Sequence, residues 1–519
     1  NNFNSILIAN RGEIACRVIR TAKKMGYRTV AVYSDADAGA PHVQLADDAV
    51  RIGPGPVGES YLVPELILQA AASSGAESIH PGYGFLSENA AFAEAVESAG
   101  LVFIGPTREA IDVMGNKAES KRRMIEAGVP CVPGYEGHDQ SDAVLLAEGL
   151  KIDLPLMVKA AAGGGGRGMR LVHKQADLAN AIKLARAEAE GAFGSGELIL
   201  EKAIIKPRHV EIQVFADTMG NTIHLGERDC SVQRRHQKVV EEAPCPVMTP
   251  ELREKMGQSA IDAAKSVNYR GAGTVEFLLD DSGFFYFLEM NTRLQVEHPV
   301  TELITGLDLV ALQIKVAQGE PLGLSQDDIN LEGHAIEVRL YTEDPSQDFL
   351  PASGPVDLWA PASGVGVRVD SGISTGQAIS PFYDPMVAKV IGYGPTREAA
   401  RLRLIGALKE TVLFGTPNNK DFLIQCLEKQ SFIDGAATTA FIAEEFSDAE
   451  LEIQPASFAD SAVAATLELC LENKGHFQKS LLVSSQLQNW TIASAMVSRK
   501  QYQFDETIHD LSISPVNSS

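Results

Sequence analysis

Apolar residues in the first part of the chain occur in short runs that alternate with helical spacing. Strands are predicted for the runs at residues 6–9, 29–33, 78–80 and 102–104. Between positions 13 and 25 the apolar residues recur with the spacing of an amphipathic helix. Strands separated by helical segments favour a parallel, doubly wound sheet. We therefore predict an α/β domain over residues 1–115.

The pattern changes to α+β in the middle of the chain, over residues 116–330. Predicted there are strands at 156–159, 197–201, 208–216 and 222–229, helices at 250–266 and 307–318, and a hairpin at 272–290. The third region, 331–446, has predicted strands at 335–341, 366–369 and 386–392 and helices at 396–409 and 419–427. In the last segment, 447–519, a helical pattern near 458–473 precedes polar sequence, which indicates the start of a further module.

The hairpin at 272–290 is the most informative of these elements. Four residues, 280–283, join its strands, so we expect Leu279 to pair with Phe284. That register predicts one wholly apolar face, made of Val275, Phe277, Leu279, Phe284, Tyr286, Leu288 and Met290.

The opposite face of the hairpin carries oxygen-bearing side chains. Glu276 and Glu289 lie on it, with Asn291 if the strand continues. Two carboxylates and an amide oxygen suit Mg²⁺, which needs few protein ligands because phosphates and water complete its shell. A solvated strand face is the alternative interpretation.

A glycine-rich segment, 163–168, follows the predicted strand that ends at Lys159. Five glycines in six positions exclude a regular element, and their backbone N–H groups can close over a polyphosphate while Lys159 supplies positive charge. A mobile linker is the alternative, because the segment lacks both the Walker pattern and a dinucleotide fingerprint.

Composition narrows the possible partners and the compartment. The 519 residues carry 45 Lys plus Arg against 68 Asp plus Glu, a formal charge of −23. That balance argues against nucleic acid or an anionic membrane as a main partner. No apolar run approaches the roughly 18 residues of a membrane span, and residues 1–10 lack a signal-peptide pattern, so a cytoplasmic location is predicted. The six scattered cysteines form no Cys-x-x-Cys pair and are expected to be free thiols.

Two clusters of mixed charge stand out in this acidic chain. Residues 227–238 concentrate cations, for which a solvated surface stretch and a nucleic-acid patch are the alternatives to a phosphate or anion site. Residues 291–299 place an arginine, a glutamine and a glutamate directly after the proposed metal ligands.

Together these segments resemble the biotin carboxylase component of biotin-dependent carboxylases. The resemblance covers about residues 1–446 and rests on IANRGEIA at 8–15, HPGYGFLSEN at 80–89, the loop 159–169, the stretch 227–244 and EMNTRLQVEHP at 289–299. It implies an ATP-grasp fold over 116–330, with a mobile lid at about 135–203. An amino-terminal Rossmann-like domain and a carboxy-terminal α+β domain would flank that fold.

The resemblance also implies which residues bind ATP and metal. The residues it assigns to the ATP phosphates are Lys117, Lys159, Gly163, Gly164, Gly165, Gly166 and Gly168. The residues it places near the adenosine are Glu201, Lys202 and His209, and it gives Gln233 and His236 to the nucleotide as well. The implied ligands of Mg²⁺ or Mn²⁺ are Glu276, Glu289 and Asn291.

The remaining implied residues act on bicarbonate and biotin. Bicarbonate would be held by Lys238, Arg293, Gln295 and Val296, and Glu297 would deprotonate it for attack on the γ-phosphate of ATP. Carboxyphosphate would then break down to CO₂ and phosphate. Once the phosphate removes the N1 proton of biotin, Arg339 and Tyr83 would stabilise the enolate-like product.

The resemblance further implies partners. Longer family members attach biotin to a lysine in a Met-Lys motif, and no Met-Lys dipeptide occurs here, so we expect the biotin carrier outside these residues. The expected partners are a biotin carrier domain and a carboxyltransferase (β) subunit within a hetero-oligomer. A homodimer is the alternative assembly. Residues 447–519, with Asn489 and Trp490, resemble the region that follows this component in acyl-CoA carboxylase α subunits, which indicates a truncated α subunit.

Three functions compete at this point. The leading hypothesis is an ATP-dependent biotin carboxylase that performs the first half-reaction of an acyl-CoA carboxylase. Another ATP-grasp ligase would pass an acyl phosphate to an amine, but Glu297 and Arg339 favour the first hypothesis. A silent assembly or regulatory subunit is disfavoured because every expected ligand is present.

Overall fold

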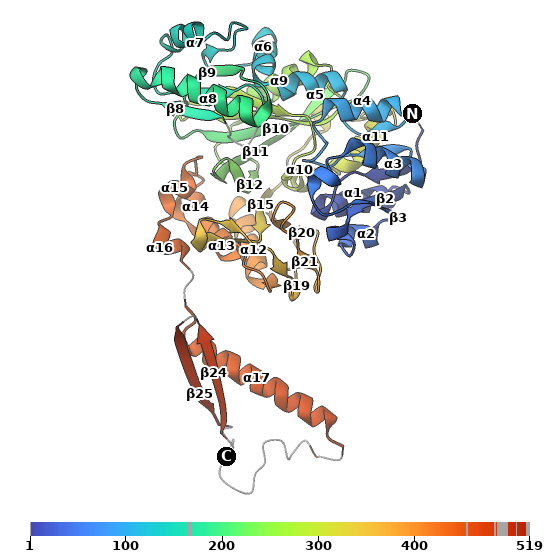
Figure 1. Ribbon diagram of the computed structural model, residues 1–519, viewed down its shortest axis with the longest axis vertical. Coiled ribbons are helices and arrows are strands. Elements are labelled where there is room, and N and C mark those ends of the chain that lie inside the picture. The colour runs from blue at the N-terminus through green and yellow to red at the C-terminus, as the bar shows by residue number, and fades with distance from the viewer. Residues whose placement is uncertain are drawn as a thin grey trace. The chain divides into compact units, whose positions relative to one another are not determined.

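The computed structural model describes residues 2–163, 168–452, 455–481, 484, 497–504 and 506–514. They form two compact units, Asn1–Ser447 and Asp448–Ser519, which are described separately below (Figure 1). Gly164, Gly165, Gly166, Asn489 and Trp490 lie outside the described residues.

A five-stranded parallel sheet opens the first unit. Its order is β3-β2-β1-β4-β5, and the strands are β1 (Ser5–Ile8), β2 (Arg28–Ser34), β3 (Asp48–Gly53), β4 (Ser78–His80) and β5 (Val102–Phe103). The connecting helices are α1 (Gly12–Lys24), α2 (Pro41–Leu45), α3 (Pro64–Ser74) and α4 (Ala90–Ser98). Consecutive residues Ile6, Leu7 and Ile8 are all fully buried, as expected where both faces of a sheet are covered. The predicted doubly wound sheet is confirmed.

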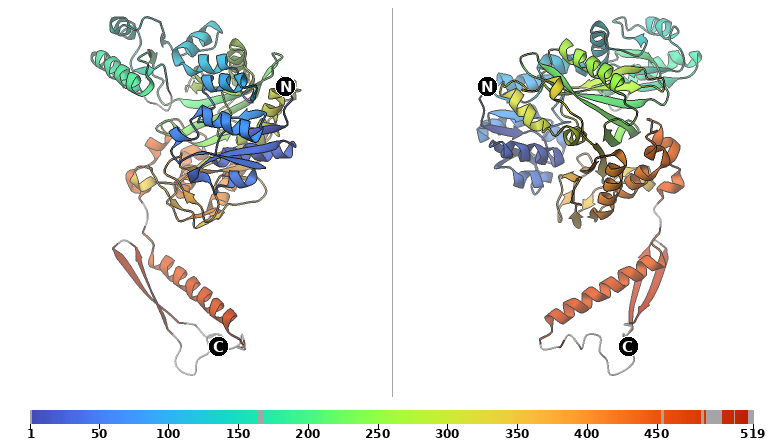
Figure 2. Two further views of the ribbon diagram at one scale, coloured as in Figure 1. Left: turned by 45° about the vertical axis from the view of Figure 1, so that its right-hand side comes forward. Right: turned by 180° about the vertical axis from the view of Figure 1, so that it is seen from behind.

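An antiparallel eight-stranded sheet forms the centre of the unit, in the order β14-β13-β10-β11-β12-β15-β22-β20. Its strands are β10 (Arg208–Ala216), β11 (Thr222–Arg234), β12 (Gln237–Ala243), β13 (Gly271–Leu279), β14 (Phe285–Asn291), β15 (His334–Tyr341), β20 (Val367–Ser371) and β22 (Met386–Gly394). Because β12 pairs with β15, the middle and third regions of the sequence share one continuous sheet. Helix α9 (Pro250–Ser266) packs on β10 and β11 (Figure 2).

A separate four-stranded sheet lies above the central one in Figure 1. Its order is β6-β9-β7-β8, with strands β6 (Gly134–Tyr135), β7 (Leu156–Ala160), β8 (Met169–Val172) and β9 (Leu198–Lys202). Helices α7 (Asp142–Gly149) and α8 (Leu178–Phe193) cover it, and Leu145, Val158 and Ile182 belong to a core of its own. The glycine segment connects β7 to β8, and Gly163 and Gly168 at its ends have positive φ angles, +89° and +68°.

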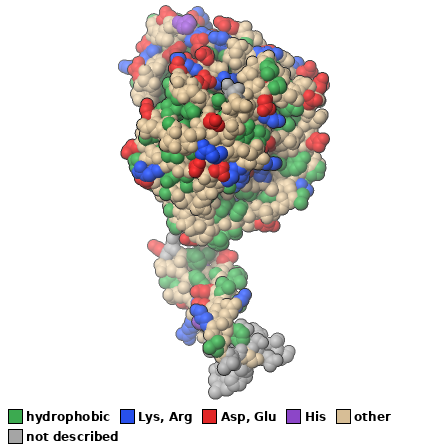
Figure 3. All heavy atoms as spheres, turned by 90° about the vertical axis from the view of Figure 1, so that its right-hand side faces the viewer, with side chains coloured by type: hydrophobic (Ala, Val, Ile, Leu, Met, Phe, Trp, Pro, Cys, Tyr) green, Lys and Arg blue, Asp and Glu red, His purple; other side chains and the backbone are tan. Residues whose placement is uncertain are grey.

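The other helices of the first unit are α5 (Arg108–Gly115), α6 (Lys117–Glu126), α10 (His298–Thr305), α11 (Leu309–Ala317), α12 (Arg397–Glu410), α13 (Lys420–Glu428), α14 (Gln430–Ile433) and α15 (Phe441–Glu445). Short strand pairs are formed by β16 (Glu343–Asp344) with β17 (Leu350–Pro351), β18 (Gly354–Pro355) with β21 (Ala378–Ile379), and β19 (Leu358–Ala360) with β23 (Val412–Phe414). On the face drawn in Figure 3, acidic and basic side chains are interspersed rather than gathered into one patch.

The β13–β14 hairpin corrects one prediction. Leu279 pairs with Phe285, so the predicted pairing with Phe284 is wrong. The side chain of Asp280 accepts hydrogen bonds from the backbone N–H groups of Ser282 and Phe284, and these bonds draw Phe284 into the turn, where it is 65% exposed.

The shifted register also changes the apolar face of β14. Phe285 and Phe287, rather than Tyr286 and Leu288, pack against the core. A register irregularity then re-aligns the strands, so that Val275 pairs with Met290 and both are buried. Glu276 therefore pairs directly with Glu289, so the two carboxylates share one face of the hairpin, as the sequence predicts.

The second unit contains α16 (Asp448–Leu451), α17 (Phe458–Lys479) and an antiparallel pair, β24 (Ser498–Phe504) and β25 (Thr507–Ile513). Ser457 and Asp460 form a capping box at the start of α17, where the sequence predicts a helix. Among the described residues, no helix combines the length and the apolar character that a membrane crossing requires.

Candidate active site

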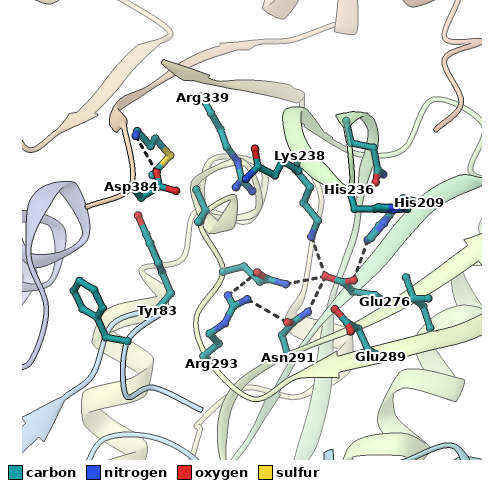
Figure 4. A pocket seen from close by; sticks show the side chains of 18 of the residues that line it. Tyr83, His209, His236, Lys238, Glu276, Glu289, Asn291, Arg293, Arg339 and Asp384 are labelled. Atoms are coloured by element: carbon teal, nitrogen blue, oxygen red, sulfur yellow. Dashed lines mark hydrogen bonds and ion pairs between the residues drawn. The ribbon is translucent and has the colours of Figure 1, made fainter. Parts of the chain in front are cut away.

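A cavity of about 500 Å³ opens in the first unit (Figure 4). The predicted site residues that line it are Tyr83, Lys117, Lys159, Glu201, His209, Gln233, His236, Lys238, Glu276, Glu289, Asn291, Arg293, Gln295, Val296 and Arg339. Glu297 lies behind this surface, fully buried and in contact with two of the lining side chains. Residues predicted from distant segments therefore converge on one cavity.

Besides Glu297, three of the predicted site residues that the structure describes do not line the cavity. The side chain of Lys202 is 44% exposed and its Nζ lies 3.6 Å from Asp153 Oδ2. Gly163 and Gly168 belong to the β7–β8 connection outside the lining. The structure therefore brings Lys159, but neither of these two glycines, to the cavity wall.

Lys238, on β12, is the centre of a buried ion cluster. Its Nζ donates to Glu211 Oε2 at 2.6 Å, to Glu276 Oε1 at 2.9 Å and to Glu297 Oε1 at 2.7 Å. Burial opposes the charge of Lys238, but the three carboxylates raise its pKa well above the usual value. The ammonium is therefore a permanent positive charge next to the cavity.

Arg339, on β15, contacts the same glutamate from the other side. Its Nη2 donates to Glu297 Oε2 at 3.1 Å, so Glu297 is held between Lys238 and Arg339. Pro299 at the start of α10 and the hydrogen bond from His298 N–H to the Gln295 carbonyl shape the turn that presents Glu297.

Glu276, Glu289 and Asn291 form the predicted metal site. Glu276 and Glu289 are opposite each other on β13 and β14, and Asn291 Nδ2 lies 2.7 Å from Glu276 Oε1. Burial, together with the charge of Glu276, raises the pKa of Glu289, and the positive charges of Lys117 and Lys238 only partly oppose this rise. This hard-oxygen donor set fits Mg²⁺ or Mn²⁺.

Two other groups of potential ligands occur among the described residues: His209, Glu211 and Glu276, and Glu211, Cys230 and Glu297. Each group already contains or contacts a cation of the protein. Burial opposes protonation of His209, but Glu276 and Glu211 raise its pKa to about 9, and Lys238 contacts Glu211 and Glu297. A protonated imidazole cannot bind a metal, which disfavours the first group, and Glu297 of the second group is held by both Lys238 and Arg339. Glu276 of the predicted set also accepts from Lys238, but that set adds Glu289 as a second hairpin carboxylate and is the better candidate.

Lysines gather where ATP phosphates are predicted. Lys159 Nζ donates to Glu201 Oε2 at 2.5 Å, and Lys121 Nζ lies 3.2 Å from Glu201 Oε1. Burial opposes ionisation of Glu201, but the two lysines lower its pKa to about 2. Lys117 begins α6, and its backbone N–H donates to the Ala161 carbonyl at 2.8 Å, which fixes it beside the end of β7.

Tyr83 and Asp384 lie across the cavity from His209 and His236 in Figure 4. The hydroxyl of Tyr83 donates to Glu13, and burial raises the pKa of this phenol well above its usual value. Tyr83 is therefore a neutral hydrogen-bonding group at neutral pH.

Reasoning from sequence missed Glu13, Lys121, Glu211 and Asp384. A signal for Glu211 exists, because His209, Glu211 and Gln213 alternate with apolar residues and so share one face of β10. For Asp384, in the connection before β22, no such periodicity exists.

The 227–238 segment is not a solvated surface stretch. Arg228 is fully buried on β11 and its guanidinium donates to Glu211, Gln213, Thr274 and Thr301. Strand β11 therefore buries Arg228, whereas Arg235 in the following turn is 69% exposed.

Three known domain families match the chain in succession. Residues 2–111 match the biotin carboxylase N-terminal domain, 116–325 the carbamoyl-phosphate synthase L chain ATP-binding domain, and 337–444 the biotin carboxylase C-terminal domain.

Curated relatives and solved structures agree with these matches. Biotin carboxylase of Nostoc sp. is 52% identical over 442 residues, 85% of this chain and 99% of that protein. The mitochondrial methylcrotonoyl-CoA carboxylase subunit alpha of Mus musculus is 50% identical over 474 residues, 91% of this chain and 66% of that protein. The biotin carboxylase domain of Hydrogenobacter thermophilus 2-oxoglutarate carboxylase, solved with MgADP, ADP and bicarbonate, gives a TM-score of 0.84 at 45% identity, over 88% of this chain and all of that one.

Fold and site define an ATP-grasp ligase of three parts, as the sequence predicts. Within that class, the chain belongs to the biotin carboxylase family. It spans about two thirds of the length of the methylcrotonoyl-CoA carboxylase subunits that it matches. The predicted cytoplasmic location stays a prediction, because several relatives are mitochondrial by name.

Proposed function

We propose that this chain performs the biotin carboxylation half-reaction of an acyl-CoA carboxylase, using ATP and bicarbonate. The observation that carries the proposal is the position of Glu297. Its fully buried carboxylate is held between Lys238 and Arg339, beside a cavity that Lys117 and Lys159 also line. A base, an anion site and a biotin-activating cation are thereby adjacent.

In the first step, Glu297 removes the proton of bicarbonate, which Lys238, Arg293, Gln295 and the backbone of Val296 hold. The bicarbonate oxygen attacks the γ-phosphorus of ATP, and ADP leaves as carboxyphosphate forms. Lys117 and Lys159 offset the charge of the two anions that meet in this step.

In the second step, carboxyphosphate gives CO₂ and phosphate, and the phosphate takes the N1 proton of biotin. Arg339 offers its guanidinium to the ureido oxygen as negative charge develops there, and Tyr83 lies across the cavity as a neutral hydrogen-bond donor. The N1 atom then attacks CO₂ to form carboxybiotin.

Glu276, Glu289 and Asn291 would hold Mg²⁺ or Mn²⁺, which supplies positive charge to the phosphates when bound. Residues 135–203, with the four-stranded sheet and the glycine segment, are proposed as a lid over the nucleotide, with Glu201, His209, Gln233 and His236 near it.

Partners complete the proposal. The carrier domain that brings biotin and the carboxyltransferase that receives the carboxyl group would be other parts of a hetero-oligomer. The support is that relatives named as carboxylase α subunits extend beyond the matched region.

The test is carboxylation of free biotin. The full chain is incubated with labelled bicarbonate, ATP, Mg²⁺ and a high concentration of biotin, and labelled carboxybiotin is measured. Slow turnover is expected, because a tethered carrier normally supplies biotin at an effective concentration in the millimolar range. Arg339→Ala should abolish the label, whereas Arg403→Ala, a change of an arginine on α12 outside the cavity, should keep it. Absence of label above the Arg339→Ala background would overturn the proposal.

A further inference from the structure

A second row of buried acids lies behind Arg339, and the mechanism above does not use it. Glu241 on β12 and Glu337 on β15 are fully buried and stand opposite each other in the strand register. Neither oxygen of Glu337, and only one oxygen of Glu241, has a hydrogen-bond partner among the described residues. Buried carboxyl groups are costly, so their presence next to a functional arginine needs an explanation.

Arg339 is held between two carboxylates. Its Nε donates to Glu241 Oε1 at 2.5 Å, and its Nη2 donates to Glu297 Oε2 at 3.1 Å. Both carboxylates are fully buried, but they differ in their partners. Glu297 also accepts from Lys238, which lines the cavity, whereas the side-chain hydrogen bond of Glu241 is to Arg339 and its second oxygen has no partner among the described residues. The Nε contact is thus independent of the substrates, and the Nη2 contact is not.

Charge decides what Arg339 can offer to biotin. While both glutamates are ionised, the guanidinium is fully compensated and has little charge to give to a developing anion. When Glu297 takes the proton of bicarbonate, it loses its negative charge and its hold on Nη2 weakens. The hydrogen bond from Nε to Glu241 persists, so the guanidinium stays in place while its Nη2 is free to bind another acceptor.

We propose that Glu241 is a positioning residue that holds Arg339 in place through Nε. When Glu297 becomes protonated it releases Nη2 of Arg339, and Nη2 is then free to bind biotin while Glu241 keeps the guanidinium in position. The inference rests on the proposed roles of Glu297 and Arg339 and adds a coupling between the two steps. The only bonds that change are those of the proton, which moves from bicarbonate to Glu297 and leaves to water after the products depart.

The surroundings of Glu241 support this role. The charged and titratable groups that interact with Glu241 are Arg339, Glu337 and Tyr341 from β15, Glu297 from the turn before α10, Cys230 from β11 and Lys238 from its own strand. Burial raises the pKa of Glu241 to about 7, Arg339 opposes the rise, and Glu297 adds to it. Protonation of Glu297 removes that repulsion and so strengthens the ionised form of Glu241 when its anchor is needed.

Glu337 has a different part in this arrangement. Burial raises its pKa well above the usual value against the opposing charges of Lys389 and Arg339, which favours a neutral group that adds no second negative charge beside Arg339. Replacing Glu337 by glutamine therefore exchanges one neutral group for another of the same size.

The test compares glutamine variants of three neighbouring buried acids in the full chain. Glu241→Gln keeps an acceptor for Nε but removes the charge, which leaves Arg339 tied to Glu297. We expect kcat/KM for free biotin to fall roughly tenfold and the ratio of ATP cleaved to biotin carboxylated to rise. Glu242→Gln is the matched control, because Glu242 follows on the same strand but binds His334 and Arg397 away from the cavity. It and Glu337→Gln should keep the ratio within about twofold of the unaltered chain.

A structural role alone would lower the amount of folded protein without changing the ratio of ATP cleaved to biotin carboxylated. If Glu241→Gln does not fold, Glu241→Asp provides the test. It retains the charge but is too short to hold Nε, so it should also raise the ratio of ATP cleaved to biotin carboxylated. An unchanged ratio and biotin KM in the folded variant would overturn the inference, as would an equal rise in Glu337→Gln. Failure of the unaltered chain to carboxylate biotin would instead overturn the proposed function.

Discussion

Lys238 and Lys389, two lysines of the same eight-stranded sheet, have different environments and different roles. Lys238 on β12 contacts three glutamates, is 13% exposed and lines the cavity. Lys389 on β22 is fully buried, donates to the Val296 carbonyl at 2.7 Å and lies 3.3 Å from Glu13 Oε1. The first lysine can exchange its partners for substrate anions, whereas the second cannot.

The cluster around Lys389 connects the three parts of the first unit. Asp370 on β20 lies 3.9 Å from Lys389 and pairs with Arg368, and Arg368 also contacts Glu302 within α10. Glu302 in turn pairs with Arg17 on α1. These ion pairs join strands of the third region to helices of the first and second. We call the ion pairs around Lys389 the sealed cluster and the groups around Lys238 at the cavity the open cluster. We infer that the sealed cluster maintains domain packing, while the open cluster serves the reaction.

Glu297→Gln and Glu302→Gln give the largest expected contrast, because these two buried acids lie on either side of the α10 start and belong to different clusters. Glu297→Gln removes the base and should reduce biotin carboxylation about 10²- to 10⁴-fold, with nucleotide affinity unchanged. Stability should hardly change, since Lys238 keeps two carboxylates and Arg339 keeps Glu241.

Glu302→Gln should lower the free energy of unfolding and leave biotin carboxylation nearly unchanged. The substitution removes one carboxylate partner of Arg17 and Arg368, and Glu302 does not line the cavity. Urea unfolding and a labelled-bicarbonate assay on both variants measure the contrast. A similar loss of stability in both would show that the two clusters are not functionally distinct.

Lys389→Met tests the sealed cluster at its centre. Removing one partner of a buried ion pair leaves uncompensated charge, so the free energy of unfolding should fall by about 3–5 kcal/mol. Lys409→Met is the matched control, since Lys409 is 60% exposed and its Nζ lies 3.5 Å from Glu428; a change below about 1 kcal/mol is expected there. Equal stability of the two variants would contradict the structural role of Lys389.

Glu289→Gln tests the open cluster where the metal is proposed. The substitution removes one charged ligand, so the Mg²⁺ concentration for half-maximal activity should rise and turnover should fall on the order of 10²-fold. Glu254→Gln on the exposed side of α9 serves as the control. An unchanged Mg²⁺ dependence in Glu289→Gln would remove Glu289 from the metal site.

The sequence predicts the open cluster better than the sealed one. Glu276, Glu289, Arg293 and Glu297 occur within two short segments, so strand alternation and motif spacing place them together. The predicted hairpin register differs from the observed one by one residue, because the alternation of apolar and polar residues does not show the hydrogen bonds by which Asp280 sets the turn.

The sealed cluster could not be derived from local pattern. Arg17 and Glu302 are 285 positions apart, and nothing in the periodicity of either helix predicts their contact. A single hint exists in Lys389, a lysine inside the apolar run 387–391, where a charged residue requires a buried partner. Such a hint shows that a partner exists but not which one.

The smallest expected effect is a pH dependence of the sealed cluster. Burial opposes ionisation of Asp370, but Arg368 and Lys389 lower its pKa to about 2, compared with about 3.9 in an unfolded chain. A lowered carboxyl pKa stabilises the folded state above the unfolded pKa, and that contribution is lost as the pH falls towards 2. Asp370 should therefore contribute roughly 2 kcal/mol near neutrality. Asp370→Asn should be less stable than the unaltered chain at pH 6, and the difference in unfolding free energy should narrow below about pH 4. Urea unfolding of both proteins at pH 6, 5, 4 and 3.5 measures this. A constant difference across that range would mean that Asp370 acts through shape or hydrogen bonding, and that charge does not hold the sealed cluster together.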